Sequence, residues 1–175
     1  MAEPCPLRAR RKENGMFDIF GNMTAEELNR AAEGLKNEGD TEGLKKLARE
    51  NGIDTAFAEL YAQGGLEEFC DVAMAAVGKL EVEAAELKPV ELVADWVEYI
   101  RTSCMDDTAL AEKVRDKKKT LKGCIAALLK WSYKNRYRID KDILDKSGIK
   151  GGVSVEMGIP GMGTAKRIIR DYYME

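Results

Sequence analysis

The segment that decides the fold runs from Pro89 to Cys104 and reads PVELVADWVEYIRTSC. Its apolar residues recur three or four positions apart, which is the spacing of one face of an α-helix. Acidic residues line the opposite side of the same helix. This pattern predicts an amphipathic helix with one buried face and one acidic face. The apolar residues are Val93, Trp96, Val97, Ile100 and Cys104, and the acidic residues are Glu91, Asp95 and Glu98.

Four helices are predicted before this segment. Thr24 and Glu27 have the spacing of a capping box at the start of the first helix. Thr41 is the predicted cap of the second and Asp54 that of the third. A longer helix is predicted over residues 66–87. The residues expected to face the core in the third and fourth helices are Phe57, Leu60, Tyr61, Phe69, Ala73, Ala76, Val77 and Leu80.

The end of the 66–87 helix carries three acidic residues, Glu81, Glu83 and Glu86. Negative charge at a helix C-terminus opposes the helix dipole and costs roughly a few tenths of a kcal/mol at an exposed site. Stability alone does not favour this arrangement. The three acids therefore indicate either a neighbouring cation or a binding partner.

Four further helices are predicted after Cys104. They cover residues 107–116, a segment capped by Thr120, residues 140–146 and a last segment capped by Thr164. In the second of these helices we expect Leu121, Cys124, Ile125, Leu128 and Leu129 to face inward, and both Trp96 and Trp131 to lie in or at the edge of the core. A brief strand is predicted near 152–156. The fold class is therefore all-α, an irregular bundle of seven to nine short helices.

Charge divides the chain into unequal parts. Residues 17–110 hold 21 acidic and 8 basic residues, whereas residues 111–175 hold 8 acidic and 16 basic residues. We interpret 1–15 as a disordered leader, 16–88 as an acidic N-terminal helical region and 89–175 as a basic C-terminal helical region, with Met16 as an alternative translation start. Opposed charges suit contact with a charged macromolecule, and equally suit solvated helix faces or attraction between the two halves.

Several classes of function are disfavoured by composition. The chain has no histidine, which removes Ser-His-Asp and Cys-His catalysis and the usual zinc hydrolase sites. The four cysteines have no metal-ligand spacing, so we interpret them mainly as buried apolar residues in a reducing cytosol. No apolar run approaches the ~20 residues of a membrane span. We therefore expect a protein that is not an enzyme, has no catalytic residues, binds no metal or cofactor and has no membrane partner.

Two basic groups are candidates for binding phosphates or an acidic partner. Cations with interleaved aromatic residues suit nucleic-acid backbones. The second group follows a glycine turn that opens the last helix, where free backbone N–H groups can bind an anion. The alternative for that turn is a purely structural role. The candidates are Lys117, Lys118, Lys119, Lys122, Arg136 and Arg138 in the first group, and Lys166 and Arg167 in the second.

Residues from about Val90 to Met174 resemble the PcfK-like family of mobile elements, which includes anti-CRISPR inhibitors of type II RNA-guided DNA nucleases. The resemblance is carried by Lys119-Thr120-Leu121-Lys122-Gly123-Cys124, by Lys134-Asn135 and by Ile168-Ile169-Arg170-Asp171-Tyr172-Tyr173. It covers about half the chain. It implies a small helical binding protein of a phage or plasmid, acting in the cytoplasm of a bacterial host cell and supplying no catalytic residues.

Two functions follow as hypotheses. The first is an anti-CRISPR-type inhibitor that binds a type II CRISPR effector nuclease through the acidic face formed by Glu91, Asp95 and Glu98. The alternative is a nucleic-acid-binding accessory protein of a phage or conjugative plasmid, which uses the basic half. The sequence also leaves open a homo-oligomer.

Overall fold

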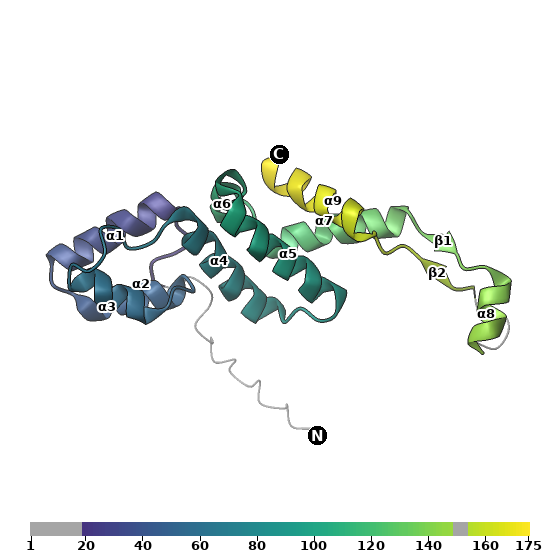
Figure 1. The fold of residues 1–175 in the computed structure, drawn as a ribbon, viewed down its shortest axis with the longest axis horizontal. Helices are drawn as coiled ribbons and strands as arrows, with labels where there is room; N and C mark the ends of the chain where they lie inside the picture. Colours follow the sequence, from purple (N-terminus) through teal and green to yellow (C-terminus); the bar gives the residue numbers. More distant parts are fainter. Residues whose placement is uncertain (1–18, 149–153) are drawn as a thin grey trace, which may run out of the picture.

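The computed structural model describes residues 19–148 and 154–175. The predicted leader, Met16 and Cys5 lie outside the described residues. The regular secondary structure of the described chain is α-helical apart from one two-stranded antiparallel sheet, so the predicted all-α class is confirmed (Figure 1). The elements are α1 Ala25–Asn37, α2 Thr41–Glu50, α3 Thr55–Ala62, α4 Val72–Leu87, α5 Leu92–Asp106, α6 Thr108–Arg115, α7 Leu121–Lys134, β1 Tyr137–Arg138, α8 Lys141–Ser147, β2 Glu156–Met157 and α9 Met162–Met174.

The N-terminal helices α1 to α3 enclose the first apolar cluster. Thr24 and Glu27 form the predicted capping box at the start of α1. The cap of α2 is Asp40 and not Thr41, because the Asp40 carboxylate accepts the Gly43 N–H at 2.8 Å. The cluster comprises Leu28, Ala32, Leu44, Leu47, Ala48, Ile53, Ala58, Tyr61, Phe69, Cys70 and Ala75.

The predicted inward face of α3 is partly wrong. Tyr61 is buried as expected, but Phe57 and Leu60 are 37% and 47% exposed, and Ala58 takes the second buried position. The sequence of α3 is apolar on most of its circumference, so helical spacing alone does not select the face that meets the core. The packing of α3 against α2 makes that choice.

Helix α4 lies between two apolar clusters. It begins at Val72 and not at residue 66, because the Asp71 carboxylate caps it by accepting the Met74 N–H at 2.6 Å. Its Ala75 belongs to the first cluster, and its Ala76 and Leu80 belong to the second. Phe69 is buried as predicted, although it precedes the helix. Ala73 and Val77 are only partly buried.

The second cluster is formed by α4, α5, α6, α7 and α9. Thr120 caps α7 as predicted, and its hydroxyl accepts the Gly123 N–H at 3.0 Å. Leu129 does not face inward but is 67% exposed. Helix α9 starts at Met162, with Gly161 as its N-terminal cap instead of Thr164. The cluster comprises Ala76, Leu80, Trp96, Val97, Ile100, Cys104, Leu110, Ala111, Val114, Leu121, Cys124, Leu128, Ala165, Ile169 and Tyr173.

The buried tryptophan and cysteine side chains belong to the two apolar clusters. Trp96 is buried as predicted, and Trp131 is half-buried at the core edge. Cys70, Cys104 and Cys124 are buried free thiols, as expected. Burial raises the pKa of the Cys104 thiol, and likewise that of Cys124, to about 12. These two residues therefore pack as small apolar groups and hold little thiolate at neutral pH.

A buried polar layer joins the two clusters. Arg115 on α6 donates to the carbonyl oxygens of Met23 at 2.5 Å and Ala75 at 3.2 Å, and to the side chain of Asn51 at 2.5 Å. Lys79 on α4 lies beside it with its ammonium buried. Each of these groups is hydrogen-bonded, which offsets the large cost of burying a charge. The layer fixes α6 to both halves of the molecule.

The acids at the end of α4 are neutralised inside the chain. Arg101 lies 2.8 Å from Glu81, Lys79 lies 3.9 Å from Glu83, and Lys122 lies 3.0 Å from Glu86. The prediction of a neighbouring cation is therefore confirmed for all three acids. No binding partner is needed to explain this acidic helix end.

The segment between α7 and α9 projects from the helical body (Figure 1). It contains β1, α8 and β2, and we call its described residues, 135–148 and 154–161, the arm. Tyr137 pairs with Met157 and Arg138 with Glu156 in the antiparallel sheet. The predicted strand near 152–156 is therefore found as β2 at Glu156–Met157, while residues 152 and 153 lie outside the described residues. Its partner strand, β1, was not predicted.

Candidate functional site: an acidic surface on the N-terminal helices

The predicted acidic face of α5 is exposed, as expected for its helical spacing. Glu91, Asp95 and Glu98 are all exposed, while Trp96 and Ile100 on the other side are buried. Glu91 precedes the helix with φ of 49°, so the chain turns sharply there. Glu98 forms an ion pair with Arg101, which also contacts Glu81. The unneutralised charge on this face therefore comes mainly from Glu91 and Asp95.

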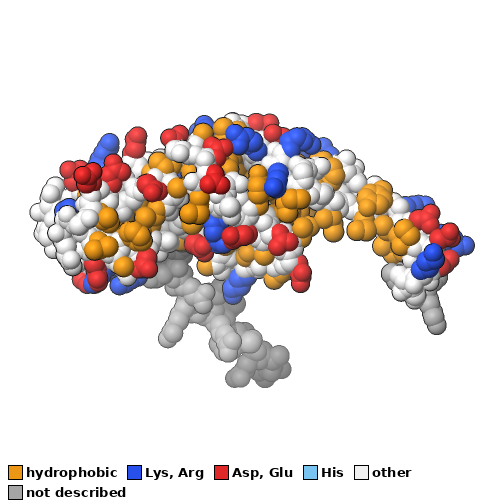
Figure 2. Space-filling view, viewed as in Figure 1, with side chains coloured by type: hydrophobic (Ala, Val, Ile, Leu, Met, Phe, Trp, Pro, Cys, Tyr) orange, Lys and Arg blue, Asp and Glu red, His pale blue; other side chains and the backbone are white. Residues whose placement is uncertain are grey.

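A second acidic surface was not predicted as a site. Four carboxylates from two separate segments line a hollow of about 470 Å³ together with Asn29, Arg30 and Tyr61. Glu26 and Glu33 come from α1, and Glu67 and Glu68 come from the segment between α3 and α4. We call this the acidic hollow. Figure 2 shows Asp and Glu side chains gathered along the edge of the molecule where α1 lies in Figure 1.

The acidic hollow is assembled by one amide side chain. Asn29 donates to the Cys70 carbonyl oxygen at 2.8 Å and accepts the Cys70 N–H at 3.1 Å. Phe69 is buried next to it and packs edge-on against Tyr61, with ring centroids 5.8 Å apart. These contacts hold the 66–71 segment against α1. Because Phe69 is buried, the neighbouring residues Glu67 and Glu68 are held in place on the solvent side of the segment.

The carboxylates of the hollow carry unneutralised charge. Among the described residues no ion pair is formed by Glu26, Glu33, Glu67 or Glu68. Arg30 is the one cation that lines the hollow within the described chain. The local field is therefore negative, and such a field attracts cationic groups over distances near the Debye length.

The predicted basic loop is mostly committed to contacts within the chain. Lys117 forms an ion pair with Glu27 at 2.8 Å, which lowers the pKa of that carboxyl. Lys119 donates to the Tyr172 carbonyl oxygen at 2.6 Å, and Lys122 pairs with Glu86. Lys118 is exposed and forms no ion pair among the described residues. The lysine run therefore presents far less free positive charge than its sequence indicates.

Side chains of α4 hydrogen-bond to the backbone of the loop between α6 and α7, which carries this lysine run. The buried Lys79 ammonium donates to the carbonyl oxygens of Val114, Asp116 and Lys119, at 2.9, 2.7 and 2.6 Å. Glu83 accepts the Leu121 N–H at 2.6 Å at the start of α7. One Lys–Glu pair thus satisfies the end of α6 and the beginning of α7. This accounts for the loop structurally without a ligand.

The other predicted cations lie elsewhere in the molecule. Arg136 lies 3.6 Å from Glu156 at the base of the arm, and its guanidinium lies 4.0 Å from the Tyr133 ring centroid. Arg138 is exposed in β1. Lys166 lies 4.7 Å from the Tyr99 ring centroid, and Arg167 lies 3.5 Å from Asp171.

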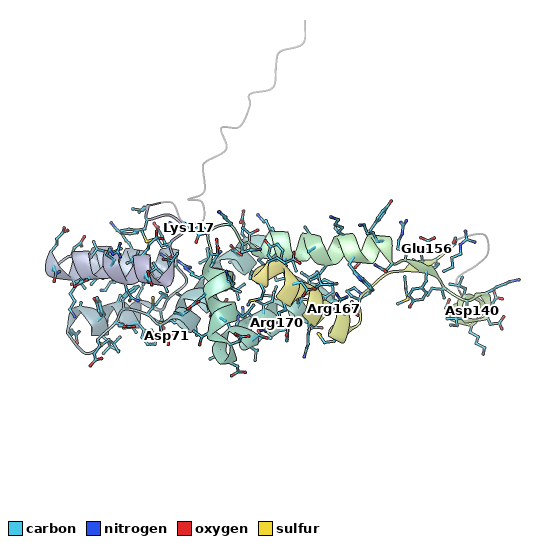
Figure 3. The ribbon with its side chains drawn as sticks, turned by 90° about the horizontal axis from the view of Figure 1, so that it is seen from above. Asp71, Lys117, Asp140, Glu156, Arg167 and Arg170 are labelled. Carbon is cyan, nitrogen blue, oxygen red and sulfur yellow. The ribbon has the colours of Figure 1, made fainter. Side chains whose placement is uncertain are left out.

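The basic candidates therefore do not form one patch. Figure 3 shows Lys117 well away from Arg167, and Glu156, the partner of Arg136, farther along, in the arm. The glycine turn before α9 places Met162 at the first helical position, and Lys166 and Arg167 follow in the second turn. Their side chains lie against Tyr99 and Asp171, as described above, so the structural interpretation of this turn is sufficient.

No metal or membrane feature is found in the described part of the chain. Residues 19–148 and 154–175 hold no group of three or more Cys, Asp or Glu side chains arranged to bind a metal ion. Over the same ranges, every helix is too short or too polar to cross a membrane.

Comparison with known proteins gives no match. No family model matches the chain, and neither does a curated protein or a solved structure. The resemblance to PcfK-like proteins stays a prediction, as do the partner and the function that it implies.

Proposed function

We propose that this protein is a non-catalytic binding protein whose acidic surface occupies a basic, nucleic-acid-binding surface of a partner protein. The observation that supports this proposal most strongly is the acidic hollow, where four carboxylates stand without an ion pair among the described residues. By contrast, four of the eight predicted cations, Lys117, Lys122, Arg136 and Arg167, form ion pairs within the described chain. The molecule thus offers more free negative than free positive charge for contact with a partner.

A type II RNA-guided nuclease is the first partner to test. Such enzymes hold nucleic acid in positively charged channels that recognise its backbone and not its sequence. An acidic helical surface with fixed carboxylates is complementary to such a channel. Complementary fields raise association rates by about tenfold or more at low salt. The same complementarity explains inhibition, because a channel filled by protein no longer admits guide or target.

The alternative function is nucleic-acid binding by the basic half. Its support comes from eight cations of the basic half that are exposed and form no ion pair among the described residues, namely Lys113, Lys118, Lys130, Lys134, Arg138, Lys141, Lys146 and Lys166. They are spread over α6, the loop after it, α7, the arm and α9. A dispersed set of cations fits a phosphate backbone less well than one continuous stripe.

Direct binding separates the two functions. The full-length protein is titrated with a panel of purified type II nucleases and with random-sequence duplex DNA, at about 50 and 200 mM salt. We expect binding to at least one nuclease, slower association at the higher salt, inhibition of target cleavage, and no binding to DNA. Binding to DNA that falls steeply with salt, together with no binding to any nuclease, would contradict the proposal.

A further inference from the structure

The acidic hollow has one buried tyrosine in its lining, and the hydroxyl of that tyrosine has no protein partner among the described residues. Tyr61 is 5% exposed, and its ring is fixed by an edge-on contact with Phe69 and by the Lys36 ammonium, which lies 4.2 Å from the ring centroid. Within residues 19–148 and 154–175 the Tyr61 hydroxyl forms no hydrogen bond. Buried tyrosine hydroxyls usually have a partner. Because Tyr61 lines the hollow, its hydroxyl is available to a group that enters from outside.

The other groups that line the hollow are mainly hydrogen-bond acceptors. Glu26 and Glu33 lie seven residues apart on one face of α1, and Glu67 and Glu68 come from the segment before α4. Burial raises the pKa of Tyr61, and the Glu33 carboxylate raises it further, so the hydroxyl is neutral and lies within the field of that carboxylate. The hollow of about 470 Å³ is in the size range of sites that hold a small ligand. It therefore suits a cation that carries several hydrogen-bond donors.

A guanidinium group fits this set of acceptors better than an ammonium group does. The guanidinium of arginine is planar, always charged and weakly hydrated, and it presents its N–H donors in a fixed fork that matches carboxylates. The ammonium of lysine is a compact charge that holds its water more strongly. Carboxylates from two segments and a hydroxyl between them can accept from several guanidinium N–H groups at once. The hollow should therefore distinguish arginine from lysine and not respond to charge alone.

The arginine that the chain itself places at this site leaves the carboxylates free. Arg30 lines the hollow beside Asn29, yet it is exposed and forms no ion pair among the described residues. The amide of Asn29 is hydrogen-bonded to the backbone of Cys70. The acceptors of the hollow therefore remain for a cation from outside the described chain, and the charge of Arg30 opposes its entry.

We infer that the acidic hollow is a pocket for an arginine side chain of the partner, whose guanidinium donates to the Tyr61 hydroxyl and to the surrounding carboxylates. The inference rests on the proposed function, because it names the group that the basic surface of the partner places in the hollow. Arginine is the residue that most often recognises planar acceptor groups such as phosphate, so a surface that binds nucleic acid supplies it.

Two peptides of equal charge test the inference. A tri-arginine amide and a tri-lysine amide are titrated into the full-length protein by isothermal titration calorimetry, at about 50 mM salt. We expect the arginine peptide to bind at least about fivefold more tightly than the lysine peptide. The variant Y61F keeps the ring and removes only the hydroxyl, so it should reduce this preference to less than about twofold.

Charge variants separate the pocket from the general field of the molecule. E67Q/E68Q should weaken binding of both peptides at least about fivefold, and R30Q should strengthen both. The matched control is D142N/D145N, which removes two exposed carboxylates that form no ion pair among the described residues. These two residues lie in the arm, at the other end of the molecule (Figure 1), so the control should bind both peptides like the wild type.

Three outcomes overturn the inference. The first is that neither peptide binds the wild type at concentrations up to about 5 mM, which is weaker than a dedicated site allows. The second is that the two peptides bind equally, and the third is that Y61F keeps the full preference while circular dichroism shows an intact fold. Each of these leaves the proposed function in place if a nuclease still binds the wild type. Arginine-selective binding without binding to any nuclease would instead contradict the proposed function and leave the pocket standing.

Discussion

Replacing Gly78 with alanine is expected to lower the free energy of unfolding by about 2 kcal/mol or more. Gly78 lies on α4, where the turn after α2 packs directly against the helix backbone. A methyl group at Gly78 would collide with the Asn51 carbonyl oxygen, and one at Gly52 with the Gly78 carbonyl oxygen. Both obstacles are backbone atoms, so neither is removed by rotating a side chain. The shift would also disturb the hydrogen bond from Arg115 to Asn51.

The variant G34A is the control, and it should change the free energy of unfolding in the opposite direction. Gly34 lies inside α1, is exposed, and has open space where a methyl group would be added. Alanine is favoured over glycine in a helix by about 1 kcal/mol, so G34A should be slightly more stable than the wild type. Urea unfolding followed by circular dichroism measures both variants. Equal stabilities of G78A and G34A would show that the turn between α2 and α3 does not pack against the backbone of α4.

Replacing Lys79 with methionine is expected to lower the free energy of unfolding by about 3 kcal/mol. The substitution removes the donor from the carbonyl oxygens of Val114, Asp116 and Lys119 and the cation beside Glu83. Buried groups left without a partner account for the loss. The control K113M changes an exposed lysine of α6 and should alter stability by less than about 0.5 kcal/mol. Equal stabilities of K79M and K113M would contradict a role of Lys79 in holding the loop.

The same variant tests a dependence on pH. Burial lowers the pKa of Lys79 to about 8, whereas an unfolded lysine titrates near 10.5. Between these two values the unfolded chain binds more protons at this group than the folded chain does. The contribution of Lys79 to the free energy of unfolding therefore rises with pH in that window. The stability difference between the wild type and K79M should be larger at pH 9.5 than at pH 7.5. A smaller difference would show that the three carbonyl contacts favour the ammonium more than burial disfavours it.

Local signals in the sequence predicted much of the helical framework. The spacing of Trp96, Val97, Ile100 and Cys104 correctly identified the buried face of α5, and Thr24 correctly identified the start of α1. Each of these features depends on residues within a few positions of one another. Helical periodicity and capping are interactions of this range, so a single sequence contains them.

Features that depend on distant residues were not predicted. The apolar spacing that includes Phe69 predicts a helix from residue 66, whereas Asn29, 41 residues before Cys70, holds the 66–71 segment in an irregular conformation. The predicted helix over residues 66–87 also concealed the acidic hollow, since it places Glu67 and Glu68 in its first turn, where acidic residues are common. Asp71 three residues before Met74 was the signal that would have placed the cap correctly.

The sequence also overstates the free positive charge of the lysine run, because the partners of these lysines are distant in the sequence. Lys117 pairs with Glu27, 90 positions away, and Lys119 contacts Tyr172, 53 positions away. The burial of Arg115 depends on Met23 and Asn51 in the other half of the chain. No local pattern shows that these cations are already engaged. Charge counted along the sequence therefore overstates the positive field of the basic half.

The central claim is that the acidic surface, and not the basic half, meets the partner. Association rates with a nuclease that binds the wild type, measured at about 50 and 200 mM salt, test it most directly. We expect E67K/E68K to slow association at least tenfold at the lower salt and E91K/D95K to slow it less, while the control K118E/K130E leaves it unchanged or faster. Circular dichroism should show an intact fold in all three, because all six side chains are exposed. Binding that survives both acidic reversals but is abolished by K118E/K130E would contradict the claim and assign the contact to the basic half.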